Sequence, residues 1–263
     1  MLRMLIGRLF RGPHTLAYPK VEAAFPERFR GRPALDASRC AAGLDGCAAR
    51  APSALFARGA GGAIGLDLGA CLFSPEEAAA CPDGALQFTR DPRLASSTRA
   101  GLLTPTGEIE RVRALDHAAR RLFGRSLRLR SVVAGSCGGC EAELTALGNV
   151  VFDLQRFGIQ FTASPRHADG VVITGVVNPN MRLALEKTLA AVPEPRLVIA
   201  VGACAISGGP FAAGSARPLG VPPGIAVDLW VPGCPPHPIT LLDGLLGLLG
   251  RLGDGDRVRG TAG

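Results

Sequence analysis

The second half of the chain alternates between short apolar runs and segments with helical periodicity. Four nearly continuous apolar runs have the length of buried strands, and they cover Leu127–Ala134, Val171–Thr174, Leu197–Val201 and Val227–Val231. Apolar residues recur at helical spacing over 141–157, 180–192 and 239–249. Alternation of strands and helices with short connections predicts an α/β domain built on a doubly wound parallel sheet.

Local signals support two of these helices and add another upstream. Asn178 is placed to cap the helix at 180–192, and Pro238 suits the first turn of the last helix. A further helix is predicted where Ile109, Val112, Leu115, Ala119 and Leu122 recur with charges between them, up to Gly124. Residues 91–106 hold turn formers and few large apolar groups, so we expect a linker there.

The first half is rich in Gly, Ala and Pro between Pro26 and Phe88, and no helix of useful length is expected there. One stretch has the frame Cys-x2-Ser-x2-Glu-x3-Cys-Pro, running from Cys71 to Pro82. Bacterial ferredoxins carry Cys-x2-Cys-x2-Cys-x3-Cys-Pro at this spacing. The stretch resembles a ferredoxin run in which Ser74 and Glu77 replace the two middle thiols.

A poorer copy of the same frame lies upstream, around Cys40 and Cys47, with Ala51 at its fourth ligand position. Residues 26–90 therefore resemble a small α+β, two-cluster ferredoxin-like domain that has lost ligands. In such domains the fourth Cys of each run binds the other cluster. One site would retain the thiols of Cys40, Cys47 and Cys81, with Asp45 as the nearest replacement for the missing ligand.

The other site would keep only Cys71, together with Ser74, Glu77 and Ala51, which is too poor a set to hold iron and sulfide. We therefore expect the second cluster to be absent. We expect the first to be absent or altered.

The remaining cysteines all follow predicted strands. Cys137 and Cys140 come after the first apolar run, Cys204 after the third and Cys234 after the fourth. Because the carboxyl ends of parallel strands share one edge of the sheet, where open α/β sheets bind ligands, the four thiols are predicted to converge. Four convergent thiolates suit zinc or an iron–sulfur cluster.

The pattern favours the cluster over zinc. Zinc ribbons usually repeat a paired spacing, whereas Cys204 and Cys234 stand singly in this sequence. Glycines beside the thiols leave backbone N–H groups free to point at sulfides, and the prolines after Cys234 exclude water and stiffen the loop.

Composition narrows the function further. The formal net charge of +7 comes from scattered arginines, since Lys20 and Lys187 are the only lysines, and there is one Trp and one Tyr. Nucleic-acid binding is therefore not expected, and acidic partner subunits or anionic lipid fit better. Eight cysteines without a secretory signal predict reduced thiols in the cytoplasm. No apolar run reaches the roughly 20 residues that cross a bilayer.

The first eleven residues, up to Arg11, could form a short amphipathic helix with Leu2, Leu5, Ile6 and Leu9 on one face. This helix is either a frayed terminus or a segment that docks on a partner or a membrane surface. The chain is accordingly divided into a docking segment at 1–25, the ferredoxin-like domain at 26–90, a linker and helix at 91–124, the α/β domain at 125–250 and a flexible tail at 251–263.

Five motifs in order carry a family resemblance over residues 125–250. They are Gly-Ser-Cys-Gly-Gly-Cys-Glu (135–141), Phe-Asp-Leu-Gln-Arg-Phe-Gly-Ile (152–159), Ser-Pro-Arg-His-Ala-Asp (164–169), Gly-Ala-Cys-Ala-Ile-Ser-Gly-Gly (202–209) and Val-Pro-Gly-Cys-Pro-Pro (231–236). This region resembles the small subunit of membrane-bound, energy-converting [NiFe] hydrogenases of the formate hydrogenlyase type. Those subunits are homologous to the complex I subunit that carries the terminal [4Fe-4S] cluster. The resemblance implies a flavodoxin-like fold.

The resemblance further implies that Cys137, Cys140, Cys204 and Cys234 bind one [4Fe-4S] cluster. This cluster would relay electrons to or from a separate large subunit of [NiFe]-hydrogenase type, in a complex with other iron–sulfur and membrane subunits on the cytoplasmic face of the cell membrane. The complex I relatives have adjacent cysteines at the first site, so the two glycines between Cys137 and Cys140 favour the hydrogenase side. The first half, including the phrase from Phe25 to Arg32, is similar to the ferredoxin-like subunit of the same complexes.

Four polar residues near the motifs have candidate roles. Glu141 and Glu143 begin a helix and are expected to be helix-dipole partners, the alternative being proton transfer where this chain meets its partner. His167 is expected to anchor a loop or an interface, and Arg166 to compensate cluster charge.

Two alternatives remain open. The chain could serve a quinone reductase of complex I type or a related complex without nickel. It could also be a scaffold protein with a structural metal site.

Overall fold

The structure, a computed structural model, describes residues 12–40, 43–58, 62–212 and 220–252, together with Gly7 and Phe10. The predicted N-terminal amphipathic helix lies outside the described residues except for Gly7 and Phe10, and so does most of the predicted tail. Among the described helices, none is long and apolar enough to cross a membrane.

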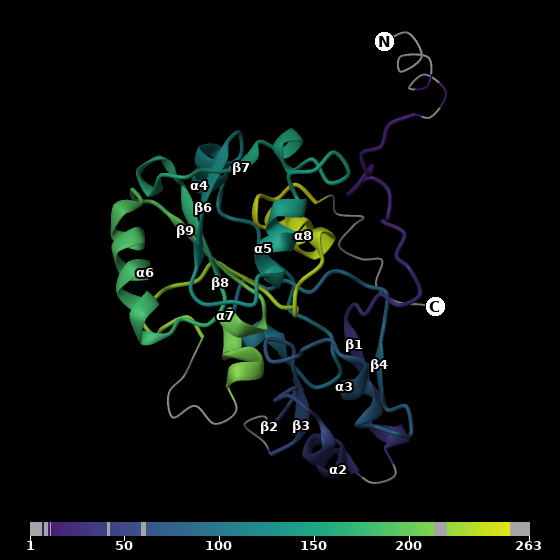
Figure 1. The fold of residues 1–263 in the computed structure, drawn as a ribbon. Coiled ribbons are helices and arrows are strands. Elements are labelled where there is room, and N and C mark those ends of the chain that lie inside the picture. Colours follow the sequence, from purple (N-terminus) through teal and green to yellow (C-terminus); the bar gives the residue numbers. More distant parts are fainter. Residues whose placement is uncertain are drawn as a thin grey trace.

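A five-stranded parallel sheet forms the centre of the second half (Figure 1). Its strands are β6 (Leu127–Val133), β7 (Ile159–Phe161), β8 (Gly170–Thr174), β9 (Leu197–Val201) and β10 (Leu229–Val231). They lie side by side in the order β10-β9-β8-β6-β7, and every neighbouring pair is parallel. Counted along the chain this order is 2-1-3-4-5, which is the flavodoxin-like arrangement and confirms the predicted fold class.

Helices cover both faces of this sheet. They are α5 (Gly139–Ala146), α6 (Pro179–Ala191), α7 (Ala203–Ser207) and α8 (Pro238–Leu248). Leu185 of α6 shares a core with Ile173 of β8, whereas Leu144 of α5 and Leu242 of α8 share the opposite core with Val172. Successive residues of one strand thus feed two cores, because side chains alternate across a strand. That double burial explains why the strands are continuously apolar.

Two of the predicted helices are confirmed and one is shorter than predicted. The side chain of Asn178 caps α6 by accepting from the N–H of Met181, and Pro238 opens α8. The predicted helix at 141–157 ends at Ala146, because a turn follows in which the side chain of Asn149 accepts from two backbone N–H groups. The short edge strand β7 was not predicted.

The helix predicted to begin near Ile109 is wrong in its first half. The helix α4 spans His117–Phe123, and the side chain of Asp116 caps it by accepting from the N–H of Ala119 at 2.8 Å. Before this cap the chain is held by tertiary hydrogen bonds. The N–H of Arg113 bonds to the Ser97 hydroxyl at 2.8 Å, and that of Leu115 bonds to a carbonyl at the end of α8 at 2.9 Å.

The first half contains two successive strand–helix–strand units. The elements are β1 (Pro33–Leu35), α2 (Gly43–Arg50), β2 (Phe56–Arg58), β3 (Ile64–Asp67), α3 (Pro75–Ala79) and β4 (Leu86–Phe88). Strand β1 pairs antiparallel with β4, and β2 pairs antiparallel with β3. This β-α-β-β-α-β order agrees with the small α+β unit that the doubled cysteine frame predicts.

The segment at 91–106, expected to be a linker, takes part in both halves. Its strand β5 (Leu103–Thr104) adds to the edge of β3. Ser96 exchanges two backbone hydrogen bonds with Trp230 at the edge of the parallel sheet, at 3.0 and 2.9 Å. Leu94 and Leu102 are buried. Isolated 3-10 turns complete the elements, at Ala37–Arg39, Ala100–Leu102, Leu154–Phe157, Pro165–His167 and Gly209–Phe211.

The two halves share one hydrophobic core. Leu55, Leu68 and Leu86 of the first half belong to the same buried cluster as Ile173 and Ala205 of the second. A Cβ placed on Gly69 would lie 2.5 Å from Cγ2 of Ile206, so the loop after β3 packs directly on α7. The position of the first half is therefore fixed relative to the carboxyl edge of the parallel sheet.

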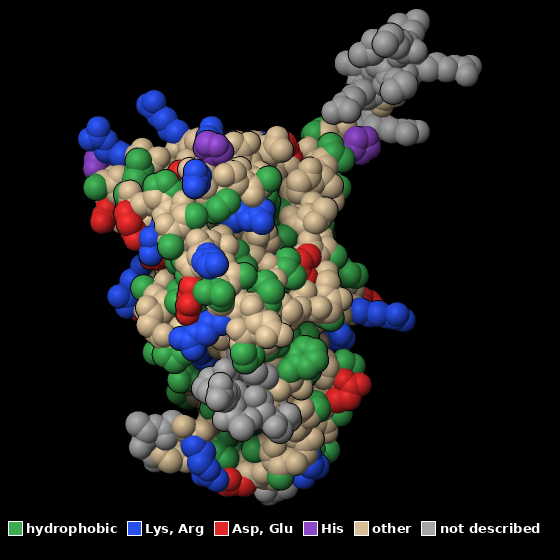
Figure 2. Space-filling model, turned by 60° about the vertical axis from the view of Figure 1, so that its left-hand side comes forward, with side chains coloured by type: hydrophobic (Ala, Val, Ile, Leu, Met, Phe, Trp, Pro, Cys, Tyr) green, Lys and Arg blue, Asp and Glu red, His purple; other side chains and the backbone are tan. Residues whose placement is uncertain are grey.

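Basic side chains are spread over the surface. On the face drawn in Figure 2, Lys and Arg side chains lie singly among apolar and uncharged ones. The formal charge of +7 is thus distributed rather than gathered into one patch on this face.

Part of the predicted docking segment packs on the chain itself. Residues 12–29 run along the second half, where Leu16 and Phe25 pack against its core. The Tyr18 hydroxyl donates to the carboxylate of Asp243 in α8, which is buried, and burial raises the pKa of this carboxyl group. Phe25, Phe29 and His237 form a cluster of rings, with the two Phe rings 4.1 Å apart.

The Tyr18→Phe substitution should lower the free energy of unfolding by about 1–3 kcal/mol, because it removes a hydroxyl donor from a buried carboxyl group. Thr15→Val is the matched control, since the Thr15 hydroxyl donates to the carbonyl of Val150 at an exposed position and its loss should cost less than about 0.5 kcal/mol. Urea unfolding of the full chain measures both values. Equal losses would show that the contact with Asp243 does not stabilise the fold.

Candidate functional site

Four cysteines lie just beyond the carboxyl ends of three strands of the parallel sheet. Cys137 and Cys140 follow β6, with Cys140 in the first turn of α5. Cys204 lies in α7 after β9, and Cys234 follows β10. The predicted placement on one edge of the sheet is confirmed.

The thiols are close enough to act on one another electrostatically. Burial raises the pKa of Cys140 to about 12, and Glu141 and the thiols of Cys204, Cys234 and Cys137 contribute to this rise. Burial, followed by Cys234 and Cys137, raises the pKa of Cys204 to about 11. Burial raises the pKa of Cys234 as well, and Cys137 adds to this. The sheet thus gathers four sulfurs from three loops into one partly buried site.

The backbone leaves room for these sulfurs where glycine is required. Gly202 has a φ of +87°, and a Cβ at this position would lie 2.6 Å from the sulfur of Cys140. A Cβ on Gly209 would lie 3.0 Å from the sulfur of Cys204. At both positions the backbone therefore lies directly against a sulfur, where no side chain would fit.

Four thiols can serve either one tetrahedral zinc ion or an iron–sulfur cluster. Among the residues that the structure describes, no three His, Cys, Asp or Glu side chains form a group that could hold one metal ion. Sulfurs around one tetrahedral zinc lie about 3.8 Å apart, because each Zn–S bond is about 2.3 Å. A cube with an iron at four of its corners needs a wider frame of thiolates. All four donors of this site are thiols, as such a cube prefers.

Glu141 connects the site to the sheet. Its carboxylate accepts from the Ser136 hydroxyl at 2.7 Å and from the hydroxyl of Thr174 at the end of β8. Glu141 also lies in the first turn of α5, which fits the expected helix-dipole role. Thr174 was missed from the sequence, although a polar residue ending an apolar run was an available signal. Glu143 is half-buried, and burial raises its pKa.

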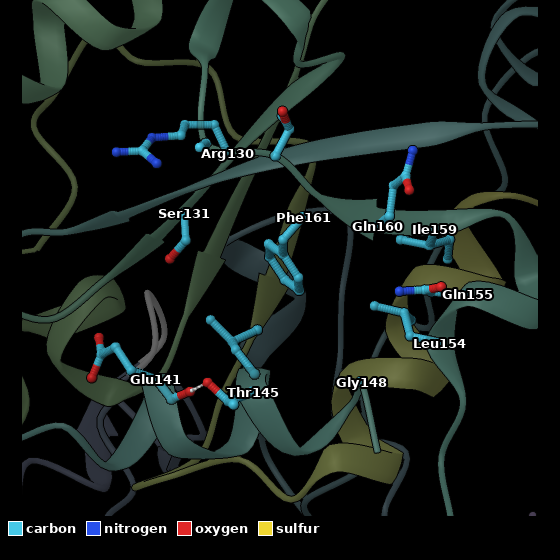
Figure 3. Close-up of a pocket in the computed structure, with 13 residues that line it drawn as sticks. Arg130, Ser131, Glu141, Thr145, Gly148, Leu154, Gln155, Ile159, Gln160 and Phe161 are labelled. Atoms are coloured by element: carbon cyan, nitrogen blue, oxygen red, sulfur yellow. Dashed lines mark hydrogen bonds between the residues drawn. The ribbon is translucent and has the colours of Figure 1, made fainter. Parts of the chain in front are cut away.

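A pocket of about 460 Å³ opens beside Glu141, between α5 and the strands β6 and β7 (Figure 3). Arg130 and Ser131 line it from β6, Phe161 from β7 and Thr145 from α5. Thr145 donates to the backbone carbonyl of Glu141 at 2.8 Å. This pocket was not predicted, because it depends on the missed edge strand.

The three thiols expected to remain at the first ferredoxin-like site are close together. The sulfurs of Cys40 and Cys47 are 3.2 Å apart, and the thiol of Cys47 hydrogen-bonds to that of Cys81. A hydrogen bond with Cys47 is the main cause that raises the pKa of Cys40, while burial is the main cause for Cys47 and Cys81. Whether these thiols bind metal stays a prediction.

The carboxylate that influences the Cys40 thiol is not Asp45, which the sequence suggested. Asp45 forms an ion pair with Arg58, and both side chains are exposed. The charge that acts on Cys40 is that of Asp83, which also raises the pKa of this thiol. Asp45 is therefore not the replacement ligand suggested by the sequence.

Arg166 and His167 lie away from the four cysteines. They form a 3-10 turn just before β8, which is the amino end of that strand. The cysteines lie at the carboxyl ends, so the expected role of Arg166 in compensating cluster charge is wrong.

The Gly202→Ala substitution should destabilise the chain more than Gly224→Ala. Both glycines have positive φ, +87° and +95°, so both substitutions carry a backbone cost of about 1 kcal/mol. Only at Gly202 does the new Cβ meet a sulfur, whereas nothing lies within 4 Å at Gly224. Denaturant unfolding of the two variants compares them directly. Equal destabilisation would mean that the sulfur of Cys140 can move aside freely.

One family model matches the second half of the chain, and the similarity to one relative extends beyond it. The model of the family described as NADH ubiquinone oxidoreductase, 20 Kd subunit, matches residues 137–248. An NADH-quinone oxidoreductase subunit of Heliobacterium modesticaldum is 45% identical over 114 residues, covering 43% of this chain and 65% of that protein. Formate hydrogenlyase subunit 7 of Escherichia coli is 35% identical over 160 residues, covering 61% of this chain and 63% of that protein.

Among solved structures, a chain of the membrane-bound sulfane sulfur reductase, an archaeal respiratory membrane complex, is 30% identical with a TM-score of 0.44, covering 56% of this chain and 84% of that one. The chain spans less than two thirds of the length of either curated relative. The matched segment holds all four of the cysteines that converge at the sheet edge. The resemblance to the complex I and hydrogenase small subunits is confirmed for residues 137–248, and the N-terminal fusion stays a prediction.

Proposed function

We propose that this chain is the electron-transfer subunit of a membrane-associated oxidoreductase of the [NiFe]-hydrogenase and complex I type. Cys137, Cys140, Cys204 and Cys234 bind one [4Fe-4S] cluster. The observation that carries the proposal is the convergence of four thiols from three loops at one sheet edge, within the segment that matches the family.

Such a cluster, when bound, accepts and returns single electrons. The chain's own residues bury its ligands and limit water, through the apolar surroundings of Cys140 and the prolines after Cys234. Gly202 and Gly209 allow the backbone to lie directly against two of the sulfurs. The hydrogen bonds of Glu141 to Ser136 and Thr174 hold the start of α5, and with it Cys140, against the sheet.

The partner proposed is a separate large subunit of [NiFe]-hydrogenase type, with other iron–sulfur and membrane subunits. The spacing Cys137-Gly-Gly-Cys140 supports the hydrogenase side, and the match to formate hydrogenlyase subunit 7 extends over more of this chain than the match to the Heliobacterium protein. Val133 and Phe161, which are exposed, and the pocket beside Glu141 form the face offered to this partner. Association with the cytoplasmic face of the membrane then occurs through the partners.

A quinone reductase of complex I type or a nickel-free related complex is the second candidate, favoured by the 45% identity to the Heliobacterium protein over the matched segment. The large-subunit sequence encoded beside this chain distinguishes the two, because a nickel site needs two pairs of cysteines there. A scaffold with a structural metal is the third candidate, and the next experiment tests it.

Anaerobic reconstitution of the full chain should give roughly four iron atoms and four sulfides per chain and an EPR signal on reduction. Cys234→Ser should remove the EPR signal, because it takes one of the four thiolates. Cys71→Ala is the control, since this buried thiol lies outside the four, and it should leave the signal in place. Bound zinc without an EPR signal would favour the scaffold instead.

The first half should add no second four-iron cluster. Cys47→Ser in the reconstituted full chain should therefore leave the EPR signal of the reduced protein unchanged, because Cys47 belongs to the incomplete ferredoxin-like site. Iron analysis that returned about eight atoms per chain would contradict the expectation that the second N-terminal cluster is absent and the first absent or altered.

A further inference from the structure

The side chain of Glu77 occupies the place of a cluster ligand in the first half. It stands third in the frame that begins at Cys71, where a two-cluster ferredoxin has a cysteine. Glu77 is completely buried, with 0% of its surface exposed. A buried carboxylate is costly unless hydrogen bonds or an ion pair compensate for the lost water.

Hydrogen-bond donors surround this carboxylate. One oxygen accepts from the N–H of Leu72 at 2.9 Å and from the Ser53 hydroxyl, and the other accepts from the N–H of Ser74 at 3.0 Å and from the thiol of Cys71 at 3.4 Å. Four donors and no acceptor suit the ionised form. None of the ion pairs among the described residues includes Glu77, so its charge is held by hydrogen bonds alone.

The charge lies beside the candidate cluster site. The loop that leads to Glu77 packs on α7, the helix that carries Cys204, as the close approach of Gly69 to Ile206 shows. Cys71, whose thiol donates to Glu77, belongs to the same buried cluster as Ala205 and Ile206, the residues that follow Cys204 in α7. Glu77 also acts electrostatically on Cys234. A negative charge in a buried setting is screened less than one in water, so its effect reaches the neighbouring ligands.

We propose that Glu77 is a fixed negative charge that lowers the reduction potential of the cluster held by the four cysteines, an inference that rests on the proposed function. Reduction adds one electron to a group that is already anionic. A neighbouring carboxylate disfavours that added charge and so stabilises the oxidised form. Glu77 does not bind the cluster. It acts on the reduction potential through its charge.

The test is redox titration of the reconstituted full chain, followed by EPR, with Glu77→Gln beside Glu76→Gln. Glu77→Gln removes the buried charge at nearly constant shape, and the potential should shift to a more positive value. Glu76→Gln removes the same charge one residue away on the same helix, but at an exposed position, and the potential should not move. A merely structural role of Glu77 in capping α3 would not change the potential.

A second variant with a smaller side chain is used if Glu77→Gln folds poorly. Glu77→Ser leaves space for water among the same donors and also removes the charge, so its potential should shift in the same direction. An unchanged potential in a folded, cluster-bearing neutral variant overturns the inference, as does an equal shift in Glu76→Gln. If the wild-type chain takes up no cluster, the proposed function fails first and the inference with it.

Discussion

This structure depends on the gathering of sulfurs at one sheet edge, where burial and neighbouring thiols disfavour ionisation. The pKa of Cys140, Cys204 and Cys234 is raised because burial and the neighbouring thiols disfavour thiolate in the free protein. A cationic inorganic core relieves both costs, since ligation removes the thiol protons and neutralises the sulfurs. The rigid strands below position the loops that carry these sulfurs.

The first half keeps more of the ferredoxin-like pattern in its fold than in its ligand positions. The β-α-β-β-α-β unit is present, while its ferredoxin-like frame has a hydrogen-bonded carboxylate at one ligand position and three thiols at the other predicted site. Its apolar side chains share a core with the parallel sheet, which contributes to its stability. Small domains usually need metals or disulfides because their own cores are small, and here the larger neighbour supplies the missing apolar contacts.

The sequence predicted those features that follow from repeated local rules. Strands buried on both faces were identified because they are continuously apolar, and the four cysteines because each follows such a strand. Strand β7 was not predicted because Gln160 and Phe161 are exposed and only Ile159 is buried. The apolar spacing from Ile109 to Leu115 matched a helix, yet hydrogen bonds to Ser97 and to the end of α8 hold that segment in another conformation. The donors around Glu77 could not be predicted either, because two of them are backbone N–H groups whose direction depends on the loop.

The residues beside Cys234 bear on the path of electrons under the proposed function. The N-terminal groups that interact with Cys234 are Cys71 and Glu77, which hold protons and charge but supply no set of ligands for iron. Cys71 and Glu77 therefore add no iron–sulfur carrier beside Cys234. Cys137, by contrast, is exposed, and the pocket beside Glu141 opens on the side of α5. Under the proposed function, the exposed Cys137 marks the side on which a partner exchanges electrons with the site.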